Sequence, residues 1–410
     1  MFKISFAHIL SLVLASIFYF YEVILRVSPS VMTEQLMEHF QISATALGFL
    51  STSYYISYSI LQIPGGMIID RFGPRRVITL STLICVIGTL IFCSQDNFYL
   101  AMLGRALIGV GSACAFISCL RIATDNFKPH YFPLIVGLAN MMGTLGATFS
   151  SKPLAIIVNQ HGWQNACIYL ALTGLVLMPA IWIFVKDNKK ENSATSFLEA
   201  FKNIAQNKQI WLLGIIAGFL FLPVTAFAEL WGVPYIMKVY GIDNQEASKA
   251  TVMIFIGAAI GSPIFPYIAH TIKSYKKALF LCAGLVATLF TLIAFAYKFS
   301  YIQTFFILFL AGFVIGAEIL VFTIARNITA DKYNATAMGF INALISFAGL
   351  IFQPILGKIL DISWSGEIAE NGVRIYSLEN YQYAILVLVA MFIISFIMLF
   401  FLKDNYSKTA

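Results

Sequence analysis

The sequence predicts an all-α membrane protein whose twelve transmembrane helices form two pseudo-symmetric bundles of six helices. Of its 410 residues, 60% are hydrophobic and only 11% are charged, and the mean hydropathy is +0.84. A soluble domain has about a quarter of its residues charged, so this chain has too little charge to cover a surface that faces water. Its apolar runs are long enough for membrane helices and far too long for the strands of a membrane barrel.

Twelve apolar runs, bounded by proline, glycine, asparagine and charged residues, are the predicted spans. They cover residues 6–31, 44–69, 76–94, 98–122, 131–157, 163–185, 210–236, 247–272, 276–297, 301–326, 333–360 and 380–402. The first run follows Lys3 but ends without the small residues of a signal-peptide cleavage site. We therefore expect it to remain as a span that also directs insertion.

The longest polar connection divides the chain into two halves of six spans. It predicts an N-terminal bundle over 1–185, a cytoplasmic linker over 186–209 with a short surface helix near 196–207, and a C-terminal bundle over 210–410. Short segments recur in the two halves at a common offset of about 200 positions, as expected for parallel repeats with a substrate site at the midplane and a rocking motion about it. The paired segments are FQIS (40–43) with YGID (240–243), GLAN (137–140) with GFIN (339–342), and Pro153 with Pro354.

The basic residues behind the net charge of +7 are distributed as expected for residues that set membrane topology, and not as in a surface that binds nucleic acid. Even-numbered connections and the two termini carry sixteen Lys and Arg residues, whereas odd-numbered connections carry four, namely Lys238, Lys249, Lys298 and Arg374. By the positive-inside rule, we expect a multi-pass protein of the inner membrane with both termini cytoplasmic. No run of Lys and Arg reaches five residues, so no nucleic-acid partner is expected.

The connection between the second and third spans predicts a gate. A glycine there allows close helix approach, and an acid at a helix end can pair with arginines and with a facing helix terminus. Such a charge cluster can hold one conformation shut; the alternative is an ordinary basic loop. The predicted gating residues are Gly66, Asp70, Arg71, Gly73, Arg75 and Arg76.

This loop, from Gly66 to Arg76, resembles the signature loop of the major facilitator superfamily. The segment LGRALIGVG (103–111) is similar to that superfamily's fourth-span motif, with Arg105 in the arginine position. The resemblance implies the twelve-helix transporter fold and a link between Arg105 and proton coupling. In the second half the loop is degenerate, with Ala269 in place of the acid, and the fifth span lacks the Gly-Pro signature of antiporters, which favours uptake.

The first span carries a narrower resemblance. FYFYEVILRVSPSVM (18–32) is similar to the first span of the proteobacterial intraphagosomal amino-acid transporter family and to bacterial relatives of lysosomal dipeptide carriers. This resemblance implies an amino acid or a short peptide as substrate.

Charged residues deep inside spans need a partner or a function. Glu22 and Arg26 lie one helical turn apart, so they either neutralise each other or bind substrate or a proton. Arg105 is a further candidate for substrate binding, with helix packing as the alternative. Glu318 and Glu229 are predicted to carry protons, because a buried carboxyl without a basic partner can bind and release one; a hydrogen-bonded, protonated carboxyl is the alternative.

Uncharged polar side chains complete the predicted substrate site. Asn140 and Asn342 occupy corresponding positions of the two halves, where an amide either contacts ligand or joins helices. Tyr21, Tyr54 and Tyr58 place phenol groups in the first two spans, where they suit a small polar ligand in an apolar pocket. Packing is the alternative for each aromatic residue.

Neither a metal nor a cofactor is expected. The six cysteines lie in apolar segments without a CxxC pair, and the five histidines are far apart in the sequence. No P-loop is present, so nothing in the sequence points to ATP as the energy source.

The sequence therefore predicts a secondary active transporter, not an enzyme, that moves a small polar metabolite by alternating access with proton-coupled uptake. A zwitterion needs one anionic and one cationic partner, and Glu22 with Arg26 and Arg105 would supply them, so an amino acid or short peptide is the favoured substrate. An organic-anion or sugar-type symporter and a transport-dead nutrient receptor are the alternatives. The expected partners are the substrate, a proton and the lipid bilayer, and the expected state is a monomer.

Overall fold

The protein folds into two compact units built from helices. The computed structural model describes residues 6–94, 96–127, 132–187, 197–329, 334–369 and 373–403, and within these the only β-structure is an isolated bridge between Ile368 and Arg374. Unit 1 comprises residues 1–40 and 50–193, and unit 2 comprises 41–49 and 194–410. The helix that begins at Ala44 therefore starts in unit 2 and continues into unit 1.

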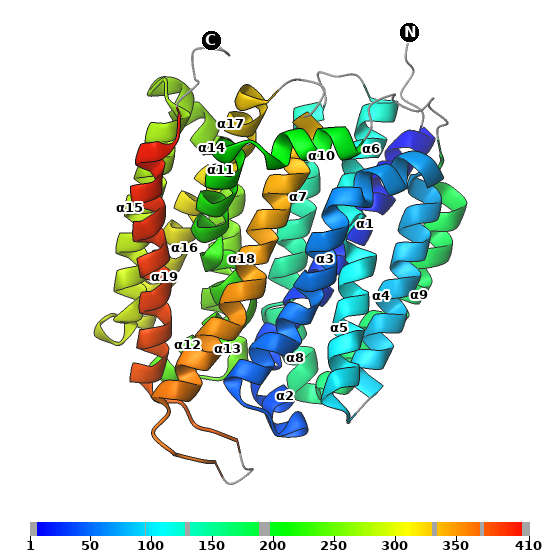
Figure 1. Ribbon diagram of the computed structural model, residues 1–410. Coiled ribbons are helices and arrows are strands. Elements are labelled where there is room, and N and C mark those ends of the chain that lie inside the picture. The colour runs from blue at the N-terminus through cyan, green and yellow to red at the C-terminus, as the bar shows by residue number, and fades with distance from the viewer. Residues whose placement is uncertain are drawn as a thin grey trace. The chain divides into compact units, whose positions relative to one another are not determined.

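Unit 1 contains the first six crossings, several of which are made of two shorter helices (Figure 1). In order they are α1 (Phe6–Val27) with the 3-10 helix η1 (Ser28–Val31), α2 (Thr33–Phe40), α3 (Ala44–Phe72), α4 (Pro74–Ser94), α5 (Phe98–Ser112), α6 (Ala115–Asn126), α7 (Phe132–Phe149), α8 (Lys152–His161) and α9 (Trp163–Phe184).

Unit 2 repeats this plan after a short linker helix. Its elements are α10 (Phe197–Ala205), α11 (Lys208–Leu220), the π-helix η3 (Pro223–Trp231), α12 (Gly232–Tyr240), α13 (Asn244–Thr251), α14 (Met253–Thr271), α15 (Tyr275–Ala294), η4 (Ala296–Lys298), α16 (Tyr301–Ile315), the 3-10 helix η5 (Gly316–Ile319), α17 (Leu320–Ile328), α18 (Asn334–Ser363), α19 (Leu378–Met398) and η7 (Leu399–Phe401).

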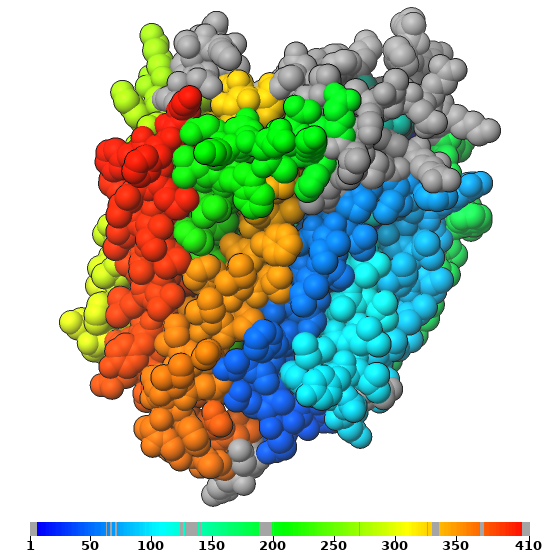
Figure 2. Space-filling view, in the orientation of Figure 1, coloured from blue at the N-terminus to red at the C-terminus, as the bar shows by residue number. Residues whose placement is uncertain are grey.

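These helices have the length and composition of membrane spans. Ten stretches of the described residues are long and apolar enough to cross a bilayer, and one of them, Met141–Phe184, is 44 residues long and holds two crossings separated by the turn at Gly162. With the 29-residue helix α3, this gives the twelve predicted spans. Large apolar side chains such as Ile393, Ile394 and Ile397 are exposed along α19, whose outer surface is visible in Figure 2, as expected for a helix that faces lipid.

The same helix pairs form in both units. In unit 1, α1 packs on α7 and α4 packs on α9; in unit 2, α11 packs on α18 and α15 packs on α19. Two close approaches also correspond, because a Cβ atom at Gly109 would collide with the carbonyl of Tyr54 and one at Gly312 with the carbonyl of Ile254. The repeat expected from the sequence is therefore present in the helix packing.

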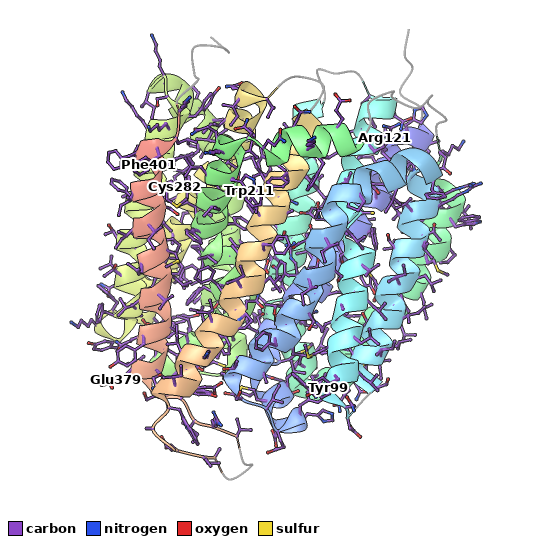
Figure 3. The ribbon with its side chains drawn as sticks, viewed as in Figure 1. Tyr99, Arg121, Trp211, Cys282, Glu379 and Phe401 are labelled. Carbon is purple, nitrogen blue, oxygen red and sulfur yellow. The ribbon has the colours of Figure 1, made fainter. Side chains whose placement is uncertain are left out.

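Each unit begins and ends at the same membrane face. Ser11 near the start of α1 hydrogen-bonds to the carbonyl of Phe184 at the end of α9 over 3.3 Å. In unit 2, the Gln209 amide donates to the carbonyl of Phe401 over 3.3 Å. In Figure 3, Trp211 and Phe401 lie at one end of unit 2 and Glu379, which starts α19, lies at the other. An even number of crossings in each unit follows from these contacts.

Several spans change their helix type or are interrupted along their length. The first passes from α-helix to 3-10 helix at Ser28, and the fourth breaks between Ser112 and Ala115. The seventh contains the π-helix η3 and the tenth contains the 3-10 helix η5. Sequence patterns predicted one continuous helix for each of these spans. Such irregular turns leave main-chain groups for side chains to bind and occur often at functional sites.

Candidate functional site

A buried carboxyl and a buried phenol join the first two spans of unit 1. The Tyr54 hydroxyl on α3 donates a hydrogen bond of 2.9 Å to Oε2 of Glu22 on α1, and neither residue is exposed. Tyr58 stacks on Tyr54 with 5.3 Å between ring centroids, and Tyr55 meets the same ring edge-on at 5.2 Å. The predicted residues Glu22, Tyr54 and Tyr58 therefore lie together.

Arg105 fastens the end of α1 to its neighbours. Its guanidinium donates to the carbonyls of Leu25 at 2.6 Å, Arg26 at 3.1 Å and Ser51 at 3.4 Å. The first two carbonyls belong to the last turn of α1, where main-chain acceptors have no partner within the α-helix and a cation is favourable. The guanidinium also lies 5.5 Å from the centre of the Tyr54 ring, within cation–π range. These contacts support the packing alternative for Arg105.

Arg26 supplies a partly exposed cation beside this group. Its charge and that of Glu22 both act on the Tyr54 phenol, so the two charged side chains lie close to the same hydroxyl. We call Glu22, Arg26, Tyr54 and Arg105 the acid–tyrosine cluster. It combines one carboxyl group, the guanidinium of a partly exposed arginine and a phenol, which are the groups that a ligand with both charges requires.

Of the other predicted substrate-binding residues, Tyr21 points to a different pair of helices. A Cβ at Gly174 on α9 would meet the Tyr21 hydroxyl, which therefore points toward α9 and the neighbouring Val86 of α4. Asn342 is partly exposed on α18 in unit 2. The side chain of Asn140 lies outside the described residues.

Glu229 lies in the π-helix of the seventh span. It is 1% exposed, in a segment whose residues are all buried. The segment packs on α14, α16 and α18. The wider π-turn therefore brings a carboxyl into the core of unit 2.

Glu318 lies in the 3-10 turn of the tenth span. Its side chain is 9% exposed, and its Oε1 has no hydrogen-bond partner within the described part of the chain. The turn is held close to α14, because a Cβ at Gly316 would collide with the main chain of Gly261 and Ser262. Cys282 on α15 lies close enough for an electrostatic interaction with Glu318, and Figure 3 shows this cysteine in unit 2. A carboxyl so placed has an oxygen available to a proton or a ligand.

One part of the predicted gate docks against the end of α9. The carboxylate of Asp187 accepts the main-chain N–H of Arg75 at 2.8 Å, and its second oxygen lies 3.6 Å from Nε of the same arginine. The Arg75 guanidinium also stacks 4.8 Å from the centre of the Trp182 ring. Gly73 has a φ of +81° and sits against Asp187, where a Cβ would overlap the carboxylate. Two properties of this position therefore require glycine.

The remaining predicted gating residues are not all described. Arg76 is exposed. The side chains of Asp70 and Arg71, and the surroundings of Gly66, lie outside the described residues. The predicted pairing of Asp70 with arginines therefore stays a prediction.

A carboxylate in unit 2 caps the start of α3. Oδ2 of Asp361 accepts the main-chain N–H of Thr45 at 2.8 Å and also the Thr45 hydroxyl. Oδ1 accepts Arg374 at 3.0 Å and the Tyr376 hydroxyl at 2.6 Å, and Tyr376 in turn accepts the N–H of Ala44 at 3.1 Å. Burial, reinforced by the bond to Asp361, raises the pKa of the Tyr376 phenol, so the phenol keeps the proton that it donates.

A groove next to this cap is mostly apolar. It has a volume of about 660 Å³ and runs between the first turns of α3, with Thr45 and Phe49, and the C-terminal half of α18, from Leu350 to Ile362. None of the predicted substrate, proton or gating residues lines it. The acid–tyrosine cluster therefore contributes no residue to its lining.

Three residues that hydrogen-bond to other segments of the chain were not singled out in the sequence. Asp187 bonds to Arg75, Asp361 to Thr45 and Gln353 to Thr225. Asp187 is the first acid after the sixth span, and Asp361 is the acid at the end of the eleventh. Gln353 directly precedes Pro354, which does belong to the repeat. An amide that directly precedes a repeat-related proline, or a carboxylate at the end of a span, is the signal that would have identified them.

The described residues contain no cluster of three metal-binding side chains, and all six cysteines are buried and unpaired with one another. The cysteine thiols instead make local contacts, such as that of Cys85 with Ser112 at 3.8 Å. They are small core residues of the helix interfaces.

Comparison with known proteins agrees with the fold. The probable sulfoacetate transporter SauU of Cupriavidus necator is 20% identical over 85% of this chain and 86% of its own length. The lysosomal dipeptide transporter MFSD1 of Pongo abelii is 23% identical over 82% of this chain and 76% of its own. A solved bacterial homolog of the human lysosomal transporter Spinster, inward-facing and unoccupied, has a TM-score of 0.79 at 16% identity over 97% of both chains. The sequence profile of the Major Facilitator Superfamily matches residues 9–354, and the chain belongs to this superfamily of membrane transporters.

Proposed function

We propose that this transporter is a secondary active symporter that takes up an amino acid or a short peptide with a proton, by alternating access. It acts as a monomer in the inner membrane with both termini cytoplasmic. The observation that carries this proposal is the acid–tyrosine cluster, in which Glu22 and Arg26 flank the Tyr54 phenol. The predicted parts are an N-terminal bundle over 1–185, a linker over 186–209 and a C-terminal bundle over 210–410.

The cluster offers one partner for each charge of a zwitterion. Glu22 is suited to an ammonium group, and Arg26, which is partly exposed, is suited to a carboxylate. Arg105 is already bonded to three main-chain carbonyls. It therefore contributes by holding the cluster in shape, and the carboxylate of the substrate is assigned to Arg26 because that residue is partly exposed.

An organic anion is the second candidate substrate. One relative is named a probable sulfoacetate transporter, and sulfoacetate carries two negative charges and no ammonium group. Such a ligand suits Arg26 but would be repelled by an ionised Glu22, so its binding requires Glu22 to be protonated. The relative named a dipeptide transporter supports the zwitterion instead.

Glu318 is proposed as the proton carrier, with Glu229 as a second coupling residue. The support for Glu318 is its burial, the partnerless Oε1 and its position in an irregular turn of the tenth span. Protons are exchanged most readily by carboxyls that lack a fixed counter-ion.

Uptake by proteoliposomes with an imposed inward proton gradient tests the substrate. The probes are alanyl-alanine, its N-acetyl derivative, its C-terminal amide and sulfoacetate. We expect alanyl-alanine to accumulate and both blocked derivatives to fail, because each has lost one of the two charges. Accumulation of the N-acetyl derivative and sulfoacetate, without alanyl-alanine, would replace the zwitterion with an organic anion. Equal uptake with and without the gradient would remove proton coupling.

A further inference from the structure

The π-helix that carries Glu229 is fastened to one residue of α18 at two places. The side-chain amide Nε2 of Gln353 donates to the main-chain carbonyl of Thr225 at 2.6 Å. The indole N–H of Trp231 donates to the main-chain carbonyl of Gln353 at 3.0 Å. Thr225 and Trp231 lie near the two ends of the π-helix, and Glu229 lies between them.

These two hydrogen bonds are important because a π-helix needs stabilising contacts to persist. A π-helix places one extra residue in a turn and is rare in comparison with the α-helix. Relaxation to an α-helix would rotate every following side chain about the helix axis. The direction of the Glu229 carboxyl therefore depends on whatever keeps Pro223–Trp231 in the π-form.

Unit 1 has a corresponding but simpler bond. Ser150, at the end of the α7 region, donates to the carbonyl of Ile24 on α1 at 3.2 Å, two residues after Glu22. Ser150 and Gln353 precede the repeat-related prolines Pro153 and Pro354. In each half, the helix that carries a buried acid is thus bound by a polar side chain from the repeat-related helix. In unit 1 this side chain is the short Ser150, and in unit 2 it is the longer Gln353, which binds a π-helix.

The chemistry of Gln353 shows that its amide has a fixed orientation. A carbonyl can only accept, so the amide nitrogen must point to Thr225. The amide oxygen is consequently also fixed, and this buried oxygen has no partner within the described residues. A buried polar atom left unpaired opposes folding, which a methionine or leucine of the same volume would avoid. The amide is therefore better explained by its bond to Thr225 than by packing.

We propose that Gln353 is a positioning residue that keeps the segment Pro223–Trp231 in the π-form and thereby sets the direction of the Glu229 carboxyl. The inference rests on the proposed function, in which Glu229 takes part in proton coupling. Gln353 acts through the helix and is not itself assigned a contact with substrate.

Site-specific carbodiimide labelling tests this inference without a substrate. The purified full chain in nanodiscs is treated with dicyclohexylcarbodiimide at about pH 5, where carboxyls buried in the membrane hold their protons and react. Mass spectrometry then gives the ratio of labelling at Glu229 to labelling at Glu318. Glu318 is in the same unit but outside the π-helix, so it serves as an internal reference.

Three variants decide the outcome. Gln353→Met keeps the volume but removes the donor, and we expect the labelling ratio to change by about threefold or more. Gln353→Glu, whose protonated carboxyl can donate to Thr225, should restore the wild-type ratio when the carbodiimide is substoichiometric, so that few chains carry a label at both 353 and 229. Ser346→Ala is the matched control on the same helix, because the Ser346 hydroxyl donates within its own helix, to the carbonyl of Asn342 at 3.0 Å; its ratio should stay at the wild-type value.

An unchanged ratio in Gln353→Met, or no restoration in Gln353→Glu, would overturn the positioning role. If Gln353→Met does not yield folded protein, Gln353→Asn replaces it, since the shorter amide keeps the polarity but cannot reach Thr225. Failure of the proposed function is seen separately, in the uptake assay of the unsubstituted protein, and leaves the labelling result intact.

Discussion

Tyr54 donates a hydrogen bond of 2.9 Å to Glu22, and both side chains are buried completely within unit 1. The bond joins α1 to α3, so Glu22 is part of an interhelix network in addition to being four residues from Arg26. A hydrogen bond from a phenol lowers the free-energy cost of burying a carboxyl group. The bond should therefore contribute to the free energy of unfolding of the protein.

Replacement of Tyr54 by phenylalanine should destabilise the protein. The change removes one donor to a buried carboxyl, which costs about 1–3 kcal/mol, so the melting temperature of the purified protein should fall. Tyr169→Phe is the control, because Tyr169 is 45% exposed on α9. Equal melting temperatures for Tyr54→Phe and the unsubstituted protein would mean that the bond contributes no stability.

Arg105→Lys separates a structural role from a substrate contact. A lysine keeps the charge but cannot donate to the carbonyls of Leu25, Arg26 and Ser51 together, so stability should fall by about 2 kcal/mol or more. Thermal unfolding measures this, and Arg76→Lys at an exposed position is the control. A variant that melts like the unsubstituted protein but no longer binds alanyl-alanine would instead place Arg105 in direct contact with substrate.

Glu318→Gln should uncouple transport from protons. The amide has nearly the shape of the acid but cannot release a proton, so proton-driven uptake of alanyl-alanine should fall by about tenfold or more, while exchange across vesicles at equal pH is kept. Glu246→Gln is the control, because Glu246 pairs with Lys249 within one helical turn of α13. Retention of full gradient-driven uptake by Glu318→Gln would show that another group carries the proton.

Two glycines with the same backbone conformation test the contact at Asp187. Gly73 has a φ of +81° and Gly162 one of +80°, but a Cβ meets the Asp187 carboxylate at the first position and nothing within 4 Å at the second. Both alanine variants should lose about 1 kcal/mol from backbone strain. Gly73→Ala should lose more, as measured by melting temperature. Equal losses would mean that the Asp187 contact adapts without cost.

Asp361→Asn should loosen the start of α3. One carboxylate oxygen accepts from Thr45 and the other from Arg374 and Tyr376, and an asparagine has only one acceptor oxygen, so one of these two sets of donors would lose its acceptor and face an amide nitrogen. We expect stability to fall by about 2 kcal/mol or more and hydrogen exchange at Ala44 and Thr45 to accelerate. Glu367→Gln in the neighbouring loop provides the comparison. Unchanged exchange at Ala44 and Thr45 would show that Asp361 does not hold this helix terminus.

The sequence by itself determined the number, order and approximate ends of the spans. The first predicted span, 6–31, ends where α1 and η1 end together. This succeeds because the membrane imposes one strong condition, namely that an apolar stretch of sufficient length must satisfy its own main-chain hydrogen bonds as a helix. The sequence also singled out Glu22, Arg105, Glu229 and Glu318, and the structure buries all four; an ionisable residue within an apolar span is easy to recognise because its burial is costly.

Only the tertiary structure decided what these charges touch. Glu22 meets Tyr54, 32 residues away in the chain, and Gln353 meets Thr225, 128 residues away. Sequence periodicity assigns a residue to a helix face but does not say which helix lies opposite. The π-helix at Glu229 and the 3-10 turn at Glu318 could likewise not be predicted from the sequence. Apolar residues fit an α-, 3-10 or π-turn equally well, and contacts with neighbouring helices select among these turns.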